Sequence, residues 1–317
     1  MNLDYIDITK FLHKDTLCTE YLQKNAVYKE AVQYHLQGCK NIEVWEYPAT
    51  NQIRIKGSIP YFVNGHNYFS TMNDWKEGLD YIAGCLNQNI YTCNVNKFEF
   101  GTIQEIPFIE ADFLHNHIKL QGMTVKPYYQ GNVLTGKVFE NSNLITKLYD
   151  VSRNIKNKLD YSIRNELSRA YGWDKEKHYI KVENHYKKPE TLFKQQNLIL
   201  SELLSDEHLK KLQIDLINTY KSIMKTGCIH IPATKSDINS GTIPLMVLKE
   251  LENIFDINTE ELIKQKIKSI PDEIFNKNDR KARVKQIKDN LKKIISTEKS
   301  SYDITELLNI KLNAENI

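Results

Sequence analysis

The sequence predicts an α+β domain that is followed by a mostly helical domain. In the first two-thirds of the chain, apolar and polar residues alternate in short runs such as Leu3–Ile8, as they do in half-buried strands. After about residue 200 the apolar residues recur at helical spacing instead. Glycine, proline, serine and asparagine are frequent in residues 226–242, which is typical of a linker. We therefore expect one domain in residues 1–200 and a second in residues 201–317, with a linker near 226–242.

Strands and a few helices make up the first domain. The alternating pattern predicts strands at Leu3–Ile8, Ile42–Tyr47, Gln52–Ile55, Asn96–Phe100, Leu144–Val151 and His178–His185. The turn-like residues Pro48–Asn51 join the second and third of these runs into a hairpin. Helical spacing predicts helices at Asp74–Cys85, capped by Asn73 or Asp74, at Phe108–Leu120, and at Tyr161–Tyr171, which ends at Gly172.

Helices dominate the second domain. The pattern predicts one helix, or two joined at Ser205, across residues 203–223, and further helices at Ile243–Phe255, Thr259–Ile270 and Asn278–Ile295. The last of these is rich in lysine and arginine, including Arg280 and Arg283. Such a helix either contacts the phosphates of duplex DNA or presents an ordinary solvated face above its apolar stripe.

The composition excludes several classes of protein. The 43 Lys+Arg residues nearly balance the 40 Asp+Glu residues, so the net charge of +3 gives no indication of a nucleic-acid partner. The five cysteines form no Cys-x-x-Cys pair, which argues against a disulfide framework or a zinc ribbon and favours a reducing compartment. No signal-peptide pattern and no membrane-length apolar run is evident. We expect a cytoplasmic protein without a membrane partner.

Two acidic residues stand within predicted strands. They are Glu99 and Glu183, and a carboxylate in a half-buried strand costs free energy unless it is paired or binds a metal. Strand alternation places Glu183 and His185 on one face, so both could bind one divalent ion together with Glu99. Oxygen and nitrogen ligands of this kind suit Mg²⁺ or Mn²⁺. The alternative is that Glu183 faces solvent and pairs with Lys181.

Tyrosines and basic residues supply the other candidates. Tyr128 and Tyr129 are adjacent, but tyrosine has a pKa of about 10 and attacks phosphorus only with the help of a cation or base; a tyrosine pair alone more often packs in a sheet. A local basic excess interleaved with tyrosines would suit single-stranded DNA, and consists of Lys147, Arg153, Lys156, Lys158, Lys187 and Lys188. The alternative is that these basic residues simply form the solvent-exposed start of a helix.

Five short motifs occur in order across roughly residues 1–200. They are Gly57-Ser58 with Phe62 and Gly65-His66-Asn67, then Lys97-Phe98-Glu99-Phe100, Tyr129-Gln130-Gly131, Lys147-Leu148-Tyr149-Asp150 and Ile180-Lys181-Val182-Glu183. In this arrangement the chain resembles the replication-initiation proteins of filamentous phages and related small plasmids, which start rolling-circle replication. The family has Gly-Ser, Lys-Phe and Gly-His-Asn in the first segment, Tyr-x-Gly, Lys-x-Tyr-Asp-Lys, and a Leu-Arg-x-Glu strand.

The resemblance implies an antiparallel-sheet nicking domain with flanking helices. It implies that Tyr129, or Tyr128 in its place, nicks origin DNA and leaves a 5′-phosphotyrosine and a free 3′-OH. Glu99 and Glu183, with His185, would hold the metal ion, while Asp150 would be a ligand or a neighbouring acid. Lys147 would contact a phosphate. The partners would be single-stranded or melted origin DNA, a host polymerase and a host helicase, because the chain has no nucleotide-binding G-x-x-x-x-G-K-[ST] loop.

Two other functions are consistent with the sequence. A non-catalytic DNA-binding protein, such as a plasmid copy-control factor, would bind DNA specifically without a covalent adduct or a metal. A phage structural protein would assemble with itself and have no affinity for DNA at moderate salt. The acids within strands and the ordered motifs favour the nicking enzyme over both.

Overall fold

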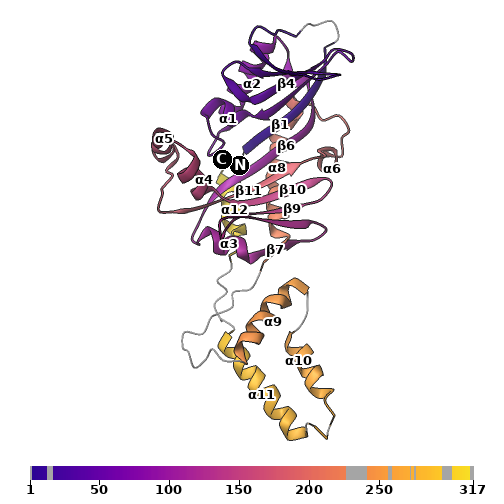
Figure 1. Ribbon diagram of the computed structural model, residues 1–317, viewed down its shortest axis with the longest axis vertical. Coiled ribbons are helices and arrows are strands. Elements are labelled where there is room, and N and C mark those ends of the chain that lie inside the picture. The colour runs from indigo at the N-terminus through magenta and orange to yellow at the C-terminus, as the bar shows by residue number, and fades with distance from the viewer. Residues whose placement is uncertain are drawn as a thin grey trace. The chain divides into compact units, whose positions relative to one another are not determined.

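A ten-stranded antiparallel sheet organises most of the chain in the computed structural model (Figure 1). The structure describes residues 2–12, 17–225, 241–255, 259–271, 273–274, 276–294 and 302–314. The strands of the large sheet are β1 (Asn2–Phe11), β2 (Leu22–Val27), β3 (Val32–Leu36), β4 (Cys39–Tyr47), β5 (Gln52–Ser58), β6 (Asn94–Ile106), β8 (Thr124–Gln130), β9 (Val133–Glu140), β10 (Leu144–Asp150) and β11 (His178–Tyr186). The α+β class predicted from the sequence is therefore confirmed.

The sheet consists of two halves with the same strand arrangement. The order is β2-β3-β4-β5-β1-β6-β11-β10-β9-β8. In each half the first strand, β1 or β6, lies innermost, and a four-stranded meander returns so that its last strand pairs with that first strand. The antiparallel pairing of β1 with β6 joins the halves. The centre of the sheet thus brings together segments that are almost 180 residues apart in the chain.

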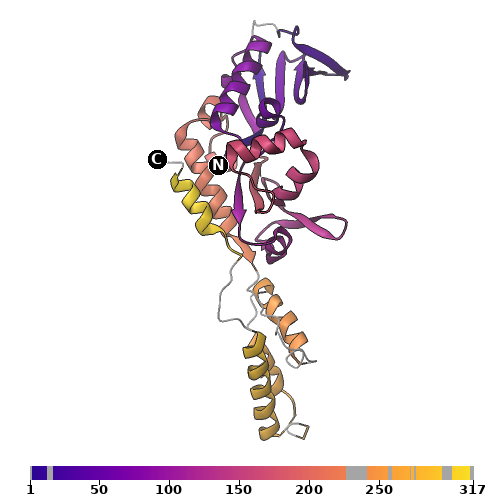
Figure 2. The same ribbon diagram turned by 90° about the vertical axis from the view of Figure 1, so that its left-hand side faces the viewer.

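Helices cover the two faces of this sheet unequally. On the apolar face, Trp75 of α2 (Met72–Leu86) donates a hydrogen bond to the Leu3 carbonyl, and Tyr186 of β11 bonds Asp215 of α8 (Asp206–Lys221). Helix α12 (Thr305–Ala314) contacts α8. On the other face, α4 (Val151–Lys158) and α5 (Tyr161–Tyr171) cover only one part. Figure 2 shows α4 and α5 on the opposite side of the sheet from α8 and α12.

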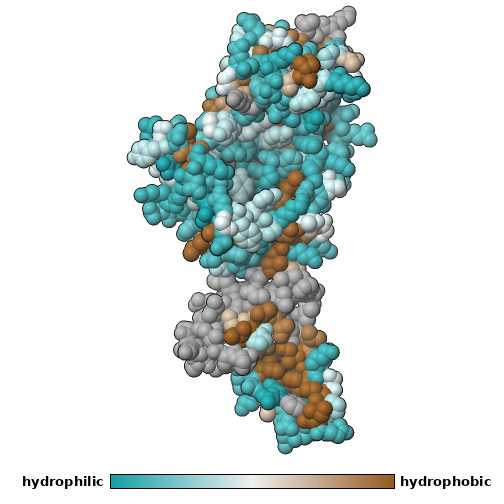
Figure 3. All heavy atoms as spheres, viewed as in Figure 1, coloured by the Kyte–Doolittle hydropathy of each residue, from teal (hydrophilic) through white to brown (hydrophobic). Residues whose placement is uncertain are grey.

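The open part of that second face is polar. Alternate residues on the central strands, such as Tyr5, Asp7, Lys56, Glu99 and His185, project to it, while their neighbours form the core. In Figure 3 the side of these elements that faces the viewer is mostly hydrophilic. A polar face on an antiparallel sheet is ordinary when water covers it, but here several of its charged side chains are buried.

Five short helical elements lie between the strands and the longer helices in the chain. They are α1 (Ile59–Asn64), a 3₁₀ turn at Ile90–Thr92, α3 (Glu110–Asn116), α6 (Glu190–Phe193) and α7 (Leu200–Leu203). Helix α1 begins at the cap Ser58 and ends at Gly65, whose φ of +69° is a left-handed conformation that glycine adopts without strain. The turn after α1 carries the segment Asn67–Thr71 to the edge of the polar face.

The chain divides into two compact units. Unit 1 comprises Met1–Leu114, Gly122–Ser222 and Ile304–Ile317, and unit 2 comprises His115–Gln121 and Ile223–Asp303. The boundary expected at residue 200 differs from this division, because α8 packs on β11 and β6 of the large sheet and so belongs to unit 1. Of the linker expected near 226–242, residues 226–240 lie outside the described residues.

Among its described residues, unit 2 has three helices and a small sheet. Strands β7 (His117–Leu120) and β12 (Ile223–Lys225) pair with each other. The helices are α9 (Thr242–Phe255), α10 (Thr259–Lys268) and α11 (Lys277–Ile294), close to the three helices predicted for this part of the sequence. Leu245 is buried among Met246, Ile263 and Ile287, which makes a small apolar core between them.

Several predicted elements need correction. The helix expected at Phe108–Leu120 ends at Asn116, where the chain enters β7 because His117 pairs with Lys225. Helix α2 begins after Thr71, whose side chain and that of Asp74 form a capping box, so neither Asn73 nor Asp74 is the cap. Ser205 caps α8 and separates it from α7. Of the two alternatives for this region, two helices joined at Ser205 is the one that the structure has. Strands β2, β3, β8 and β9 were not predicted.

Within the part of the chain that the structure describes, no helix is both long and apolar enough to cross a membrane.

Candidate active site

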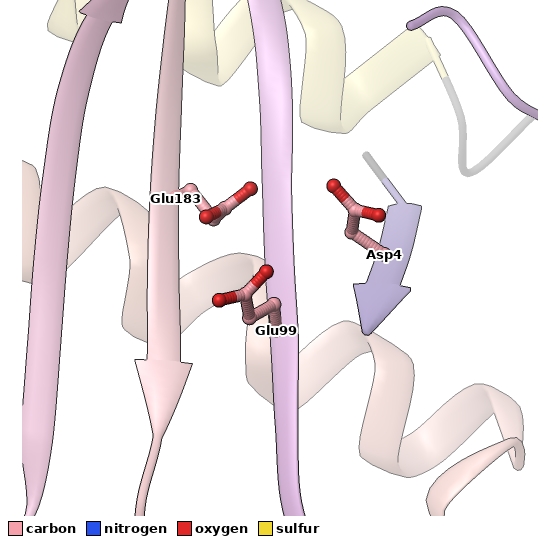
Figure 4. A group of neighbouring side chains, drawn as sticks. All are labelled: Asp4, Glu99 and Glu183. Atoms are coloured by element: carbon pink, nitrogen blue, oxygen red, sulfur yellow. The ribbon is translucent and has the colours of Figure 1, made fainter. Parts of the chain in front are cut away.

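Three carboxylates meet at the centre of the polar face. Asp4 comes from β1, Glu99 from β6 and Glu183 from β11, three strands that are adjacent in the sheet. One oxygen of each lies within 4.8 Å of the others, and Figure 4 shows all three side chains pointing toward the same point. We call Asp4, Glu99 and Glu183 the acidic cluster. Asp4 and Glu183 are almost completely buried.

A bulge in β1 brings Asp4 to this face. Leu3 pairs with Phe100 and Ile6 with Phe98, so two residues of β1, Asp4 and Tyr5, lie opposite Glu99 alone. Bulges often reorient side chains near active sites. Here Asp4 contacts Lys181 and Tyr5 stacks on His185, with ring centroids 6.0 Å apart, so both side chains project to the face that carries Glu99.

Gly101 allows β11 to approach β6 closely beside the cluster. It pairs with Glu183. A Cβ atom at this position would lie 2.7 Å from the Val182 carbonyl oxygen and 3.0 Å from Cα and Cβ of Glu183. Any larger residue would therefore displace the backbone that carries Glu183.

Two lysines are inserted between the carboxylates. Nζ of Lys147 lies 2.6 Å from Oε1 of Glu99 and 2.9 Å from Oε1 of Glu183. Nζ of the buried Lys181 lies 2.6 Å from Oδ2 of Asp4 and 2.8 Å from Oε2 of Glu183. That Oε2 atom is buried and accepts no well-aligned hydrogen bond, although Lys181 is near. The pairing of Glu183 with Lys181 that we considered does occur, but in a buried site rather than at a wet surface.

The remaining polar neighbours hold Asp4 and Glu99 in place. Ser58 Oγ donates to Asp4 Oδ1 at 2.6 Å, and Asn67 Nδ2 donates to Asp4 Oδ2 at 2.7 Å. Nδ1 of His185 lies 2.7 Å from Glu99 Oε1. The acids are thus oriented by side chains on three strands, β5, β10 and β11, and on the turn after α1.

Electrostatics keep Glu99, Lys147 and Lys181 charged at neutral pH. Burial acts to raise the pKa of Glu99, but the hydrogen bond with His185 and the charge of Lys147 outweigh it and lower that pKa from 4.5 to about 2. Burial acts to lower the pKa of Lys147 and of Lys181, but the adjacent carboxylates hold both pKa values above the ordinary value. Three carboxylates and two ammonium groups leave one net negative charge.

This donor set fits a hard divalent cation. Carboxylate oxygens are the ligands that Mg²⁺ and Mn²⁺ prefer, and Mg²⁺ typically takes one or two protein carboxylates while it keeps several waters. Three converging carboxylates satisfy that requirement, and the buried Oε2 atom of Glu183 lacks a well-aligned donor. The site differs from the predicted one, since Asp4 completes the group of three and His185 contacts Glu99 beside it.

We expect the low pKa of Glu99 to contribute to stability in mildly acidic solution. Because the folded pKa of about 2 lies below the ordinary 4.5, this contribution is present above pH 4.5 and is lost as the pH falls toward 2. Denaturant unfolding measured between pH 5 and pH 2 should therefore show a shallower decline of stability for Glu99→Gln than for the unmodified protein. Glu176→Gln, at a side chain that is 78% exposed, is the control and should keep the original slope. If stability declined equally steeply with falling pH in Glu99→Gln and in Glu176→Gln, the low pKa of Glu99 would not be a source of stability.

Two tyrosines lie beside the cluster. Tyr149 of β10 places its ring 5.8 Å from Nζ of Lys181, and burial raises its pKa well above 10. Burial and Asp7 raise the pKa of Tyr5 to about 12. Neither hydroxyl ionises at neutral pH in this environment, so either would need added positive charge to act as a nucleophile.

The predicted tyrosines Tyr128 and Tyr129 lie on the edge strand β8, and both are more than half exposed. Tyr128 pairs with Gly136, Gly136 with Tyr149, and Tyr149 with Lys181, so all four residues share the polar face. Three strand spacings, about 14 Å, separate the backbones of Tyr128 and Lys181. Tyr129, the next residue, pairs with Leu134 across a bulge that leaves Thr135 of β9 unpaired, and alternation within β8 places it on the face opposite Tyr128.

The other predicted site residues are dispersed. Asp150 was expected beside the metal, but it is the cap of α4: its carboxylate accepts a hydrogen bond from the Arg153 backbone nitrogen at 2.8 Å. It pairs with Ile180, and so lies on the face opposite Lys181. Lys187 pairs with Glu140 at 3.0 Å. The remaining basic residues are exposed or partly exposed. They are Lys156, Lys158 and Lys188 in unit 1, and Arg280 and Arg283 on α11 of unit 2.

No protein-family model, curated protein or solved structure matches this chain in sequence or structure comparisons.

Proposed function

We propose that this protein is a divalent-metal-dependent DNA nickase and strand transferase that starts rolling-circle replication. The observation that carries the proposal is the convergence of three carboxylates from three adjacent strands on a polar sheet face. Such a site suits phosphoryl transfer, because a divalent ion held by carboxylates stabilises negative charge on the phosphate in the transition state. The ordered sequence motifs supply the link to replication initiation.

In this proposal Asp4, Glu99 and Glu183 hold a Mg²⁺ or Mn²⁺ ion. Lys147 and Lys181 keep the carboxylates together in the free protein and contact the substrate phosphate when DNA is bound. His185 and Tyr5 flank the opening toward the rest of the polar face. All of these groups are on strands, which position side chains more accurately than loops do.

A tyrosine hydroxyl is the proposed nucleophile. Its oxygen attacks the phosphorus, the bond from phosphorus to O3′ breaks, and the released 3′ oxygen takes up a proton to become the 3′-OH. The products are a 5′-phosphotyrosine and a primer end for a host polymerase. The phosphodiester energy is kept in the protein–DNA bond, which is consistent with a chain that lacks a nucleotide-binding loop and relies on a host helicase.

Tyr128 is the preferred nucleophile on geometric grounds, although the sequence motif favours Tyr129. Tyr128 lies on the face of the acidic cluster, and Gly136 leaves the space between Tyr128 and Tyr149 without a side chain. Tyr128 is also 55% exposed, so a strand of DNA can reach it.

The first test is a metal-dependent covalent adduct. The protein is incubated with Mn²⁺ and single-stranded fragments tiled across its own replicon, and protein-linked DNA is detected on a denaturing gel. We expect the adduct to disappear in Tyr128→Phe and to persist in Tyr129→Phe, because only the first hydroxyl shares the face of the acids. Loss in Tyr129→Phe alone would restore the motif assignment. Absence of any adduct, with tight DNA binding retained, would refute the nickase.

A non-catalytic DNA-binding protein is the second candidate. The observation that favours it is that Lys147 and Lys181 already compensate much of the charge of the acidic cluster, as in a purely structural ion-pair network. Lys156, Lys158, Lys187 and Lys188, together with Arg280 and Arg283, would then contribute phosphate contacts as they would in the enzyme. Stoichiometric binding without a metal requirement distinguishes this candidate.

A further inference from the structure

A cavity of about 820 Å³ opens directly beside the acidic cluster. Asp4, Lys181 and Gly101 form one of its walls, so the cavity and the acidic cluster share the side chain of Asp4. The turn after α1 and the start of α2 form a second wall, and the first turns of α8 form a third. All of these residues belong to unit 1. Its volume is typical of a pocket for a small organic ligand and is larger than a metal ion requires.

An aromatic pair lines one side of this cavity. Phe69 stacks on Tyr171 with ring centroids 5.8 Å apart and an angle of 18° between the planes. Its ring also meets Tyr179 edge-on, at 6.1 Å. Tyr171 is 40% exposed and Phe69 is partly exposed, so this aromatic surface is accessible to a ligand.

The backbone of Phe69 is strained where it presents this ring. Its φ is +54°, a left-handed conformation that bulky residues rarely adopt because it brings the side chain too close to the backbone. A glycine would relieve the strain, yet the chain keeps a phenylalanine. The Phe69 side chain must therefore stabilise the protein, by packing or by binding a ligand, more than its strained backbone destabilises it.

Polar and cationic groups make up much of the remaining lining of the cavity. Lys181, Lys210 and Lys311 line the cavity against the acids Asp4 and Asp206, which leaves an excess of one positive charge. Asn67, Ser70, Thr71, Thr102 and Gln213 add amides and hydroxyls. An aromatic surface, hydrogen-bonding groups and an excess of cations are the features that recognise a nucleotide, which has a flat base, a sugar and a phosphate.

We propose that this cavity binds one unstacked nucleotide of single-stranded DNA, with its base on Phe69 and Tyr171 and its phosphate toward the acidic cluster. The inference rests on the proposed function and names the substrate more closely: a single strand in which the base next to the reacting phosphate is turned out of the stack. Duplex DNA would have to be melted at this position before it could bind.

The test uses short oligothymidylates that each carry one 2-aminopurine, a base whose fluorescence is quenched by stacking. Full-length protein is titrated with the set in the absence of metal, so that no cleavage occurs. We expect one or two adjacent probe positions to be quenched. Phe69→Gly should weaken binding about tenfold and remove the quenching, because one base–aromatic stack is lost while the backbone conformation is retained.

Three further variants make the result specific. Phe69→Tyr keeps the ring and should retain quenching, and Tyr171→Ala should lose it if Phe69→Gly fails to fold. Tyr161→Ala removes a side chain that is 73% exposed outside the cavity and should behave as the unmodified protein does. Uniform fluorescence at every probe position, or quenching that survives in both Phe69→Gly and Tyr171→Ala, would overturn the inference.

The same variants separate this inference from the nickase. An adduct that forms normally in Phe69→Gly would leave the nickase in place and remove the nucleotide site. Position-specific quenching that depends on Phe69, in a protein that forms no adduct, would retain the nucleotide site and refute the nickase.

Discussion

Lys181→Met is expected to lower the free energy of unfolding by about 3–5 kcal/mol, the largest stability effect we predict for a single substitution. Lys181 is the buried counter-ion of Asp4 and Glu183, at 2.6 and 2.8 Å. Methionine has a similar volume but no charge, so the variant leaves two carboxylates close together with only Lys147 nearby. Denaturant unfolding of the full-length protein measures the loss.

Added Mn²⁺ should restore part of that stability. If the acidic cluster binds a divalent ion, the variant loses a competing cation from the site, so its affinity for Mn²⁺ should increase. A ligand present at about 100 times its dissociation constant stabilises the folded state by about 2.7 kcal/mol. The stability of Lys181→Met should therefore rise more steeply with Mn²⁺ concentration than that of the unmodified protein.

Lys177→Met is the matched control. Lys177 directly precedes β11, four residues before Lys181, and pairs with Glu105 of β6 at 2.9 Å, but both side chains are about half exposed. Ion pairs between exposed side chains contribute little to stability, so this variant should unfold almost as the original does and should not respond to Mn²⁺. A large loss in Lys181→Met without any response to Mn²⁺ would mean that the cluster is an ion-pair network and not a metal site.

Much of the candidate site could be predicted from strand alternation. Glu99, Glu183 and His185 were identified because acids and a histidine stood at regular positions in clear β patterns, and Lys147 because a motif marked it. Asp4 was missed. Simple alternation in β1 places Asp4 on the same face as Ile6 and Ile8, and only the bulge opposite Glu99 turns it to the polar face. An acid in line with buried isoleucines was itself a signal of such an irregularity.

The two unpredicted edge strands, β2 and β8, lack the pattern on which the predictions depended. In β8, no residue is buried, and in β2 only Leu22 is buried, so neither edge strand has an apolar face for sequence to reveal. Asp150 was misplaced for a different reason. The resemblance to the Lys-x-Tyr-Asp-Lys motif suggested a metal ligand or a neighbouring acid, but an aspartate directly before a helix also satisfies the first backbone N–H groups of that helix, and here that role prevails.

Glu183→Gln is expected to reduce the rate of adduct formation on the order of 10²–10³-fold, as the loss of one preorganised charge-stabilising group does in other phosphoryl- and acyl-transfer sites. Glu183 is the residue that touches both lysines, and it is 2% exposed. Glutamine keeps its size. Lys147 retains Glu99 and Lys181 retains Asp4, so the fold should survive, as unfolding measurements can verify.

DNA binding should respond in the opposite direction. Removal of one negative charge beside the proposed phosphate position should leave affinity for single-stranded DNA unchanged or slightly higher, because less repulsion opposes the backbone. Binding is measured by fluorescence anisotropy without metal, and adduct formation by the denaturing gel with Mn²⁺. Glu105→Gln, on the same strand as Glu99 but about half exposed, is the control and should alter neither quantity. Normal adduct formation in Glu183→Gln would exclude the acidic cluster as the active site, whereas loss of chemistry with intact binding would separate catalysis from recognition and disfavour the non-catalytic alternative.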